Sequence, residues 1–164
     1  MPSMTKVWFE SETLRRLITN ERIVGIKDSS GDMDYFQTVI DLKKQREDWS
    51  VLIGPETKMI EVVRGGADGG VNGGANLYPR LFASAYQAAL DNDDTLCDSL
   101  QEKIVALGQI YDVGKYASRH IKATKCAAGL LGLCDDFLAE PFNRFYEEDR
   151  KRVKEILDSR DWES

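Results

Sequence analysis

The chain has 164 residues, a formal net charge of −6 at pH 7 and 42% hydrophobic residues, which is the composition of an ordinary globular protein. Because nucleic-acid binding needs a basic face, the acidic balance argues against a nucleic-acid partner. No apolar run approaches the ~20 residues that cross a bilayer, and the N-terminal sequence lacks the apolar stretch of a signal peptide. We therefore expect a cytoplasmic protein with no membrane partner.

Cysteine and histidine are too few and too scattered to indicate a metal site. The three cysteines form no C-x-x-C pair, and His120 is the only histidine. The sequence thus predicts no disulfide framework and no thiolate or multi-histidine site, and we expect no metal and no cofactor. Cys126 and Cys134 lie in an apolar helical stretch and are predicted to be small core residues. His120 is predicted to lie on the surface or in helix packing.

Helix-like and strand-like segments alternate over the first part of the chain. A short helix at 12–18, capped by Ser11, precedes a run of β-branched residues that is typical of a buried strand. The polar stretch 28–32 ends this strand and can cap the next helix. The strand–helix unit occurs three times, with strands at 23–26, 51–53 and 69–72 and helices whose apolar positions lie within 35–40, 59–63 and 81–90.

The alternation stops after residue 90. Helices are predicted at 94–114, at about 118–131 and from near Pro141 onward. Strands that alternate with helices imply a parallel sheet with right-handed crossovers. The sequence therefore predicts an α/β part over 1–92 and a C-terminal helical region over 93–164, without a low-complexity linker between them.

Lys27 directly follows the first predicted strand and so lies at its carboxyl end, where barrels and open α/β sheets carry their chemistry. An amine sheltered by apolar neighbours loses its proton more easily and can attack a carbonyl carbon to form an imine. Most lysines at strand ends are simply solvated, so the position alone does not separate a catalytic lysine from a surface one.

Three motifs, in order, resemble one enzyme family. Residues 23–32, IVGIKDSSGD, resemble the imine-lysine strand of the dihydrodipicolinate synthase and N-acetylneuraminate lyase family. VLIG at 51–54 resembles the next strand with its active-site glycine, and the glycine-rich segment 65–76 resembles the last barrel strand with its loop. The helical region is similar to the family's C-terminal three-helix region.

The resemblance implies a partial TIM (β/α)8 barrel, made of the last three β/α units and followed by the three-helix region. It also implies an imine between Lys27 and pyruvate or another 2-keto acid, with Gly54 in the active site and the Val71 carbonyl close to the lysine. Asn72 and Gly73, beside Val71, complete the expected substrate-binding residues. The alternative for the glycine-rich segment is a packing role, because glycines allow tight turns and close backbone approach.

Parts of the family pattern have no counterpart in this chain. A TIM barrel needs eight strands and about 250 residues, so the N-terminal units are expected to be missing, and with them the carboxylate-binding Gly-Thr-Thr-Gly-Glu loop. Met1-Pro2 matches only the last two positions of a Tyr-Asn-x-Pro motif whose tyrosine is the proton shuttle.

Met4 stands where dihydrodipicolinate synthases commonly have a substrate-binding arginine. Because methionine cannot make the bidentate carboxylate contact of an arginine, that activity fits less well. A sugar-acid aldolase, a lyase or another 2-keto acid enzyme of the family fits better.

Two functions therefore compete. In the first, the chain is half of a Schiff-base-forming aldolase or lyase that is inactive alone. In the second, it is a non-catalytic half-barrel remnant that serves as an assembly or binding module.

A third hypothesis, a flavodoxin-like nucleotide binder, needs only the β/α alternation, but the chain has no phosphate-binding motif. Because three strands cannot close, we expect either an N-terminal half-barrel partner or self-association as a homo-oligomer.

Overall fold

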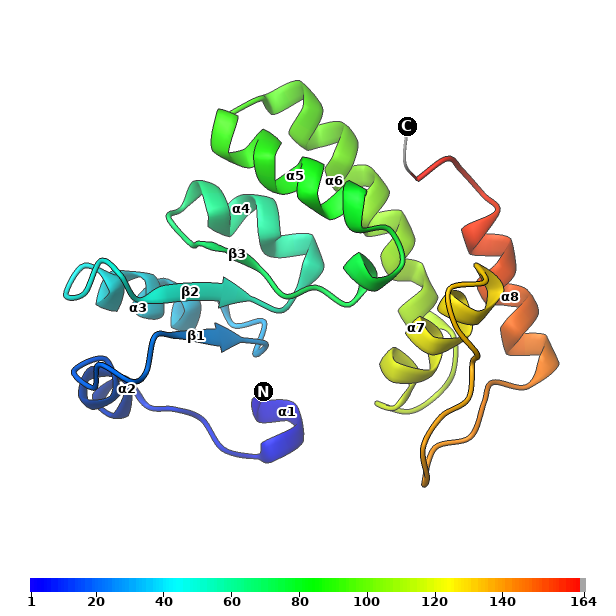
Figure 1. Ribbon diagram of the computed structural model, residues 1–164, viewed down its shortest axis with the longest axis horizontal. Coiled ribbons are helices and arrows are strands. Elements are labelled where there is room, and N and C mark those ends of the chain that lie inside the picture. Colours follow the sequence, from blue (N-terminus) through cyan, green and yellow to red (C-terminus); the bar gives the residue numbers. More distant parts are fainter. Residues whose placement is uncertain (163–164) are drawn as a thin grey trace.

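Three short parallel strands form one sheet in the order β1–β2–β3 (Figure 1). They are β1 (Gly25–Asp28), β2 (Ser50–Ile53) and β3 (Gly69–Gly70). The computed structural model describes residues 1–162, and in it helices separate the strands as the sequence predicts. The predicted α/β class, with three consecutive β/α units, is confirmed.

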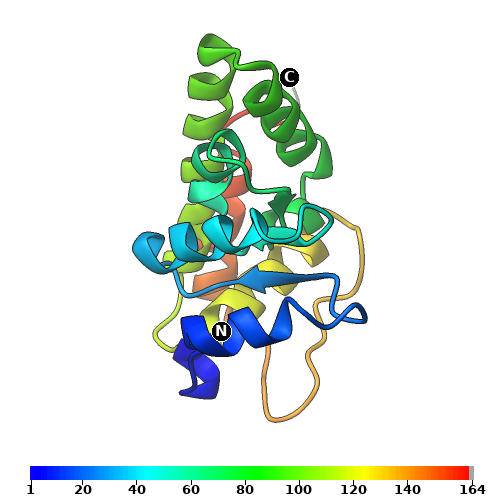
Figure 2. The ribbon, with the colours of Figure 1, turned by 90° about the vertical axis from the view of Figure 1, so that its left-hand side faces the viewer.

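The helices cover one side of the sheet and continue past its end. In Figure 1, α7 and α8 lie beyond the end to which the strands point, and Figure 2 shows the same helices behind the sheet. The helical segments are α1 (Pro2–Thr5), α2 (Ser11–Leu17), α3 (Met33–Lys43), η1 (Glu56–Lys58), α4 (Met59–Arg64), η2 (Gly74–Asn76), α5 (Pro79–Asp91), α6 (Asp94–Gly108), η3 (Gln109–Asp112), α7 (Arg119–Leu130) and α8 (Glu147–Leu157).

Strand β1 begins two residues later than predicted and contains Lys27 instead of ending before it. The reason is backbone pairing, because Lys27 lies opposite Leu52 and Asp28 lies opposite Ile53 in the parallel ladder. Lys27 is therefore held in the strand by its pairing with β2. Its position at the carboxyl end of the strand agrees with the prediction.

Three other boundaries also differ from the predicted ones. Strand β3 contains only two residues. Ser11 is the first residue of α2, with Glu10 as its N-cap. The last helix begins at Glu147 instead of near Pro141, and its first turn carries three acidic residues. Negative side chains are favourable beside the unpaired N–H groups of a helix start, which explains why the helix begins there.

One cluster of buried hydrophobic residues extends from Leu14 in α2 to Trp162 near the C-terminus. The two predicted regions, 1–92 and 93–164, therefore share a core, and the boundary between them stays a prediction.

A polar contact made by Asp68 adds to the packing of α3 against the sheet. Asp68 pairs with Lys43 of α3 and accepts a hydrogen bond from the Val51 amide of β2 at 2.7 Å.

The side of the sheet next to β1 is uncovered. Val24, just before β1, is 67% exposed, and Val71, just after β3 at the opposite edge, is 53% exposed, although both belong to strand segments that bury their side chains in a closed barrel. The N-terminal segment lies below β1 in Figure 1 and is fixed to α3, since the Tyr35 hydroxyl donates to the Phe9 carbonyl at 2.8 Å. Strands β1 and β3 each keep one unpaired edge within the described residues.

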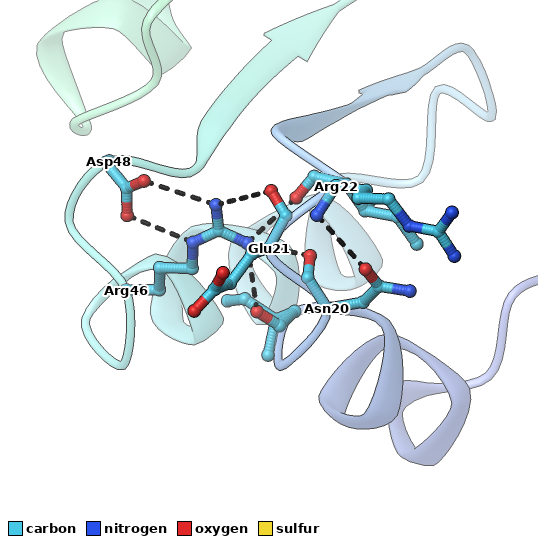
Figure 3. A network of polar contacts seen from close by, with 7 residues as sticks. Asn20, Glu21, Arg22, Arg46 and Asp48 are labelled. Atoms are coloured by element: carbon cyan, nitrogen blue, oxygen red, sulfur yellow. Dashed lines mark hydrogen bonds and ion pairs between the residues drawn. The ribbon is translucent and has the colours of Figure 1, made fainter.

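Arg46, which follows α3, holds the connection between α2 and β1 (Figure 3). Its Nη1 atom donates to the carbonyl oxygens of Ile18, Asn20 and Ile23 at 3.2, 3.0 and 2.9 Å. Its Nε atom donates to Asp48 at 3.0 Å, and the side chain is only 17% exposed. Because Ile23 lies just before β1, this guanidinium fixes where that strand begins.

We expect Arg46→Ala to lower the free energy of unfolding by about 2–3 kcal/mol, because three carbonyl groups lose a charged donor. Urea unfolding followed by circular dichroism measures this change. Arg22→Ala is the matched control, since the exposed Arg22 side chain points away from the network in Figure 3 and its loss should cost less than about 0.5 kcal/mol. Equal losses in the two variants would contradict the assignment.

Candidate functional site

The parallel ladder brings the ends of all three strands to one edge of the sheet. The Gly54 amide donates to the Asp28 carbonyl at 2.6 Å, and the Val71 amide donates to the Ile53 carbonyl at 2.8 Å. The residues that follow β2 and β3 are thus fixed in space beside the end of β1. Lys27, Gly54 and Val71 share this edge because of backbone pairing.

Gly54 lies directly against the Lys27 side chain. A β-carbon at position 54 would lie 3.0 Å from Lys27 Cε and 2.1 Å from Ser29 Oγ. Glycine at position 54 therefore leaves room for the Lys27 and Ser29 side chains, which a β-carbon would displace. Lys27 is exposed, so the described residues do not provide the apolar shelter that the sequence analysis expects for a reactive amine.

Asp28, the residue after Lys27, lies on the opposite face of the strand and is 5% exposed. Its carboxylate accepts hydrogen bonds from the Ser30 amide at 3.1 Å and the Ser30 hydroxyl at 2.7 Å. This carboxylate closes the turn after β1.

A pocket of about 1270 Å³ lies at these strand ends. Four of the predicted site residues line it, namely Lys27, Gly54, Val71 and Gly73. Asn72 is not among the lining residues. It is 6% exposed, and its Nδ2 atom donates to the Gly54 carbonyl at 3.0 Å, which ties the loop after β3 to the end of β2. The substrate-binding roles of all these residues stay predictions.

The helical region forms the opposite wall of the pocket. Tyr111 of η3 and His120 and Thr124 of α7 all line it. The Tyr111 hydroxyl donates to Glu56 Oε1 at 2.9 Å, and the Tyr111 and His120 rings lie 5.2 Å apart between centroids. The part of the chain beyond residue 92 therefore contributes directly to the candidate site.

Glu56 joins the glycine-rich loop to this helical wall. Its Oε1 atom also accepts from the Gly74 amide at 2.6 Å, while Oε2 is buried without a hydrogen-bond partner among the described residues. A β-carbon at Gly73 would lie 2.9 Å from the Tyr111 hydroxyl and 3.2 Å from Glu56 Oε1. Gly73 thus leaves room for the Glu56–Tyr111 pair.

The two partners of this pair have shifted proton affinities. Burial raises the pKa of Glu56, and the hydrogen bonds from Gly74 and Tyr111 oppose that rise. Burial and the nearby Glu56 carboxylate raise the pKa of Tyr111 well above its usual range. The Tyr111 hydroxyl therefore keeps its proton at neutral pH.

Sequence reasoning does not identify Glu56 or Tyr111. Glu56 follows Gly54-Pro55 at the carboxyl end of a strand. This position is the one feature of the sequence that could have marked Glu56 as a candidate site residue. Tyr111 looks like one more apolar position of a helix, and no local pattern reveals its distant partner. His120 is exposed, as predicted for a surface residue, but it also stands beside Tyr111 on the pocket wall.

The predictions for the cysteines are correct in one case and wrong in the other. Cys126 is buried in α7, whereas Cys134 is exposed and lines the pocket. The helix ends at Leu130, and Gly132 turns the chain with a φ of 72°, so Cys134 lies outside the helical packing.

Within residues 1–162, no cluster of three metal-binding side chains occurs, and no helix is long and apolar enough to cross a membrane.

Parallel β/α units with a lysine at the carboxyl end of a strand and helices around the strand ends are the arrangement of part of a TIM-barrel protein, although open α/β sheets share it. The model of the Dihydrodipicolinate synthetase family matches residues 1–160, and the chain belongs to this family.

Relatives with assigned functions align over almost the whole chain. A 4-hydroxy-tetrahydrodipicolinate synthase of Methanospirillum hungatei is 28% identical over 157 residues, which are 96% of this chain and 52% of that protein. An Escherichia coli K12 protein named "Probable 2-dehydro-3-deoxy-D-pentonate aldolase" is 28% identical over 158 residues, with coverages of 95% and 52%. The chain thus spans about half the length of the curated relatives it matches.

Solved structures confirm the partial barrel. Dihydrodipicolinate synthase from Bacteroides thetaiotaomicron superposes with a TM-score of 0.91 at 43% identity, over 97% of this chain and 54% of that one. YagE from Escherichia coli, solved in complex with pyruvate, superposes with a TM-score of 0.88 at 19% identity, over 97% and 53%, and supports the fold alone.

Burial of Glu56 makes the stability of the chain depend on pH. Because the folded-state pKa is raised above its ordinary value of 4.5, the stabilising contribution is present below pH 4.5 and is lost as the pH rises through the folded pKa. Glu56→Gln cannot titrate, so we expect the wild type to lose stability relative to this variant as the pH increases from 4.5 to neutrality. Urea unfolding at a series of pH values measures the difference.

Tyr111→Phe provides the matched comparison for this titration. It removes a hydrogen bond that lowers the pKa of Glu56, so the pH range of the stability loss should extend upward. Parallel pH profiles for the wild type and Glu56→Gln would show that the carboxyl group is not perturbed.

Proposed function

We propose that the chain is the lysine-bearing half of a Schiff-base-forming aldolase or lyase that acts on pyruvate or another 2-keto acid. The observation that carries the proposal is the placement of Lys27, which lies at the carboxyl end of a barrel strand, against Gly54 and in a pocket. Membership of the Dihydrodipicolinate synthetase family supports the same reaction class. A cytoplasmic location accords with this class of enzyme.

In the proposed reaction the unprotonated Lys27 amine attacks the keto carbon of the substrate, and water leaves to form an imine. The protonated imine withdraws electrons from the adjacent carbon, so that a neighbouring C–C bond can break or form. Gly54 leaves space for the lysine side chain, and Val71 and Gly73 border the bound substrate.

The preferred substrate is a sugar-derived 2-keto acid. Met4 cannot bind a second carboxylate as arginine does, and one relative, at 28% identity, is named a probable aldolase of a 2-dehydro-3-deoxy sugar acid. The competing function, a non-catalytic half-barrel, is favoured by one observation, which is the exposure of Lys27.

Trapping at Lys27 separates the two functions. With the rest of the barrel supplied, pyruvate and borohydride should reduce the imine to a stable adduct on Lys27, which peptide mass spectrometry detects. Lys27→Arg should abolish the adduct, whereas Lys125→Arg, a change in another lysine of the same pocket, should leave it. An adduct on a different lysine, with Lys27 unmodified, excludes the proposed role.

We infer that the open side of the sheet receives either an N-terminal half-barrel or a second copy of this chain. The 164-residue chain alone should have no appreciable turnover, because the family's proton-shuttle tyrosine and carboxylate loop are not in it. A positioned acid or base typically contributes about 10²–10⁴-fold to a rate. An N-terminal half-barrel would supply both the missing groups and the cover over β1, whereas a second copy of this chain would supply the cover alone.

We expect the 164-residue chain to self-associate at micromolar concentration, because unpaired strand edges and exposed apolar side chains promote association. Val24→Lys, at the uncovered edge, should reduce the association measured by sedimentation velocity. Leu90→Lys, at an exposed position on α5, is the control and should not. A monodisperse, cooperatively melting wild-type monomer that binds no hydrophobic dye would refute the inference.

A further inference from the structure

The Tyr111 hydroxyl is held so that it can only accept a hydrogen bond from a ligand. Its proton is donated to Glu56 Oε1 at 2.9 Å, and the oxygen keeps a free lone pair. The Thr124 side chain lies near Tyr111 and opposes the rise that burial causes in its pKa. The Thr124 hydroxyl donates its own proton to the His120 carbonyl at 2.9 Å. Donation to a carboxylate polarises the phenol and makes its oxygen a better acceptor.

A donor stands beside this acceptor on the same wall of the pocket. The His120 ring lies 5.2 Å from the Tyr111 ring, and both residues line the pocket. The imidazole is exposed, and its Coulombic interaction with Glu56 opposes the rise that burial causes in the pKa of that carboxyl group. A histidine ring carries at least one N–H donor in either charge state.

An adjacent acceptor and donor fit one kind of group best. A carboxylate only accepts and would find no donor in Tyr111, whereas an ammonium group only donates and would find no acceptor in the His120 N–H. A hydroxyl group both donates and accepts, so it can satisfy Tyr111 and His120 at once.

We propose that Tyr111 and His120 form a hydroxyl-recognition subsite, with Glu56 as the residue that positions Tyr111. The subsite binds the part of the ligand beyond the carbon that reacts with Lys27, so the proposal rests on the proposed function for the reacting end. It deepens that function by assigning the choice of a hydroxylated substrate to residues of the helical region.

The experiment uses two acids of equal charge and chain length, D-gluconate and hexanoate, titrated into the 164-residue chain and followed by amide NMR shifts. Neither acid has a carbonyl group that can form an imine, so the result is independent of any imine at Lys27. The wild type should bind D-gluconate more tightly than hexanoate. Tyr111→Phe should reduce this preference by about two- to tenfold, which corresponds to one hydrogen bond.

Two further variants distinguish recognition from folding. Glu56→Ala releases Tyr111 and should reduce the preference, whereas Glu56→Gln keeps an acceptor oxygen for Tyr111 and should retain most of it. Asp112→Asn, which changes another carboxyl group on the pocket wall, should leave the preference intact. Circular dichroism verifies that each variant is folded.

Two results overturn the proposal. One is the absence of D-gluconate binding by the wild type, and the other is an unchanged preference in folded Tyr111→Phe and Glu56→Ala. Failure of borohydride trapping at Lys27 overturns only the proposed function, because it does not affect this measurement.

Discussion

The parallel pairing of β1 with β2 is the constraint on which the rest of the site depends. It places Lys27 opposite Leu52 and extends to the bond between the Gly54 amide and the Asp28 carbonyl. A shift by one residue would turn the lysine to the buried face, because side chains alternate along a strand. The network around Arg46 fixes where β1 begins and so supports this register from a distance.

Glu56 is the residue that fixes the helical region against the strand ends. A single carboxylate oxygen accepts from the Gly74 amide and from the Tyr111 hydroxyl, and thereby joins the loop after β3 to a helix beyond residue 92. Burial disfavours the charged form of this carboxyl group and therefore raises its pKa. A boundary at residue 92, useful for describing the sequence, therefore does not separate the residues that line the pocket.

Local patterns predict much of this structure, and contacts between distant segments account for what they miss. The strand at Lys27 and the helix start at Asp32, whose side chain accepts from the Tyr35 amide at 2.9 Å, follow from short-range signals, whereas Gly54 is singled out by the family resemblance. The pairing of Glu56 with Tyr111 depends on how the helices pack against the strand ends, and no spacing in the sequence encodes it. The hydrogen bond from Asn72 to the Gly54 carbonyl likewise joins two segments that are distant in sequence, and no local pattern predicts it.

The two walls of the pocket differ in how much they depend on the rest of a barrel. Glu56 is held by hydrogen bonds within the described chain, so the wall formed by Tyr111 and His120 is already built. Lys27, by contrast, is exposed on the open side of the sheet, and the apolar surroundings that favour a neutral amine must come from added strands. Under the two proposals, recognition of the distal end of a ligand and activation of the lysine are separable, because the first depends on contacts inside this half and the second on cover from added strands.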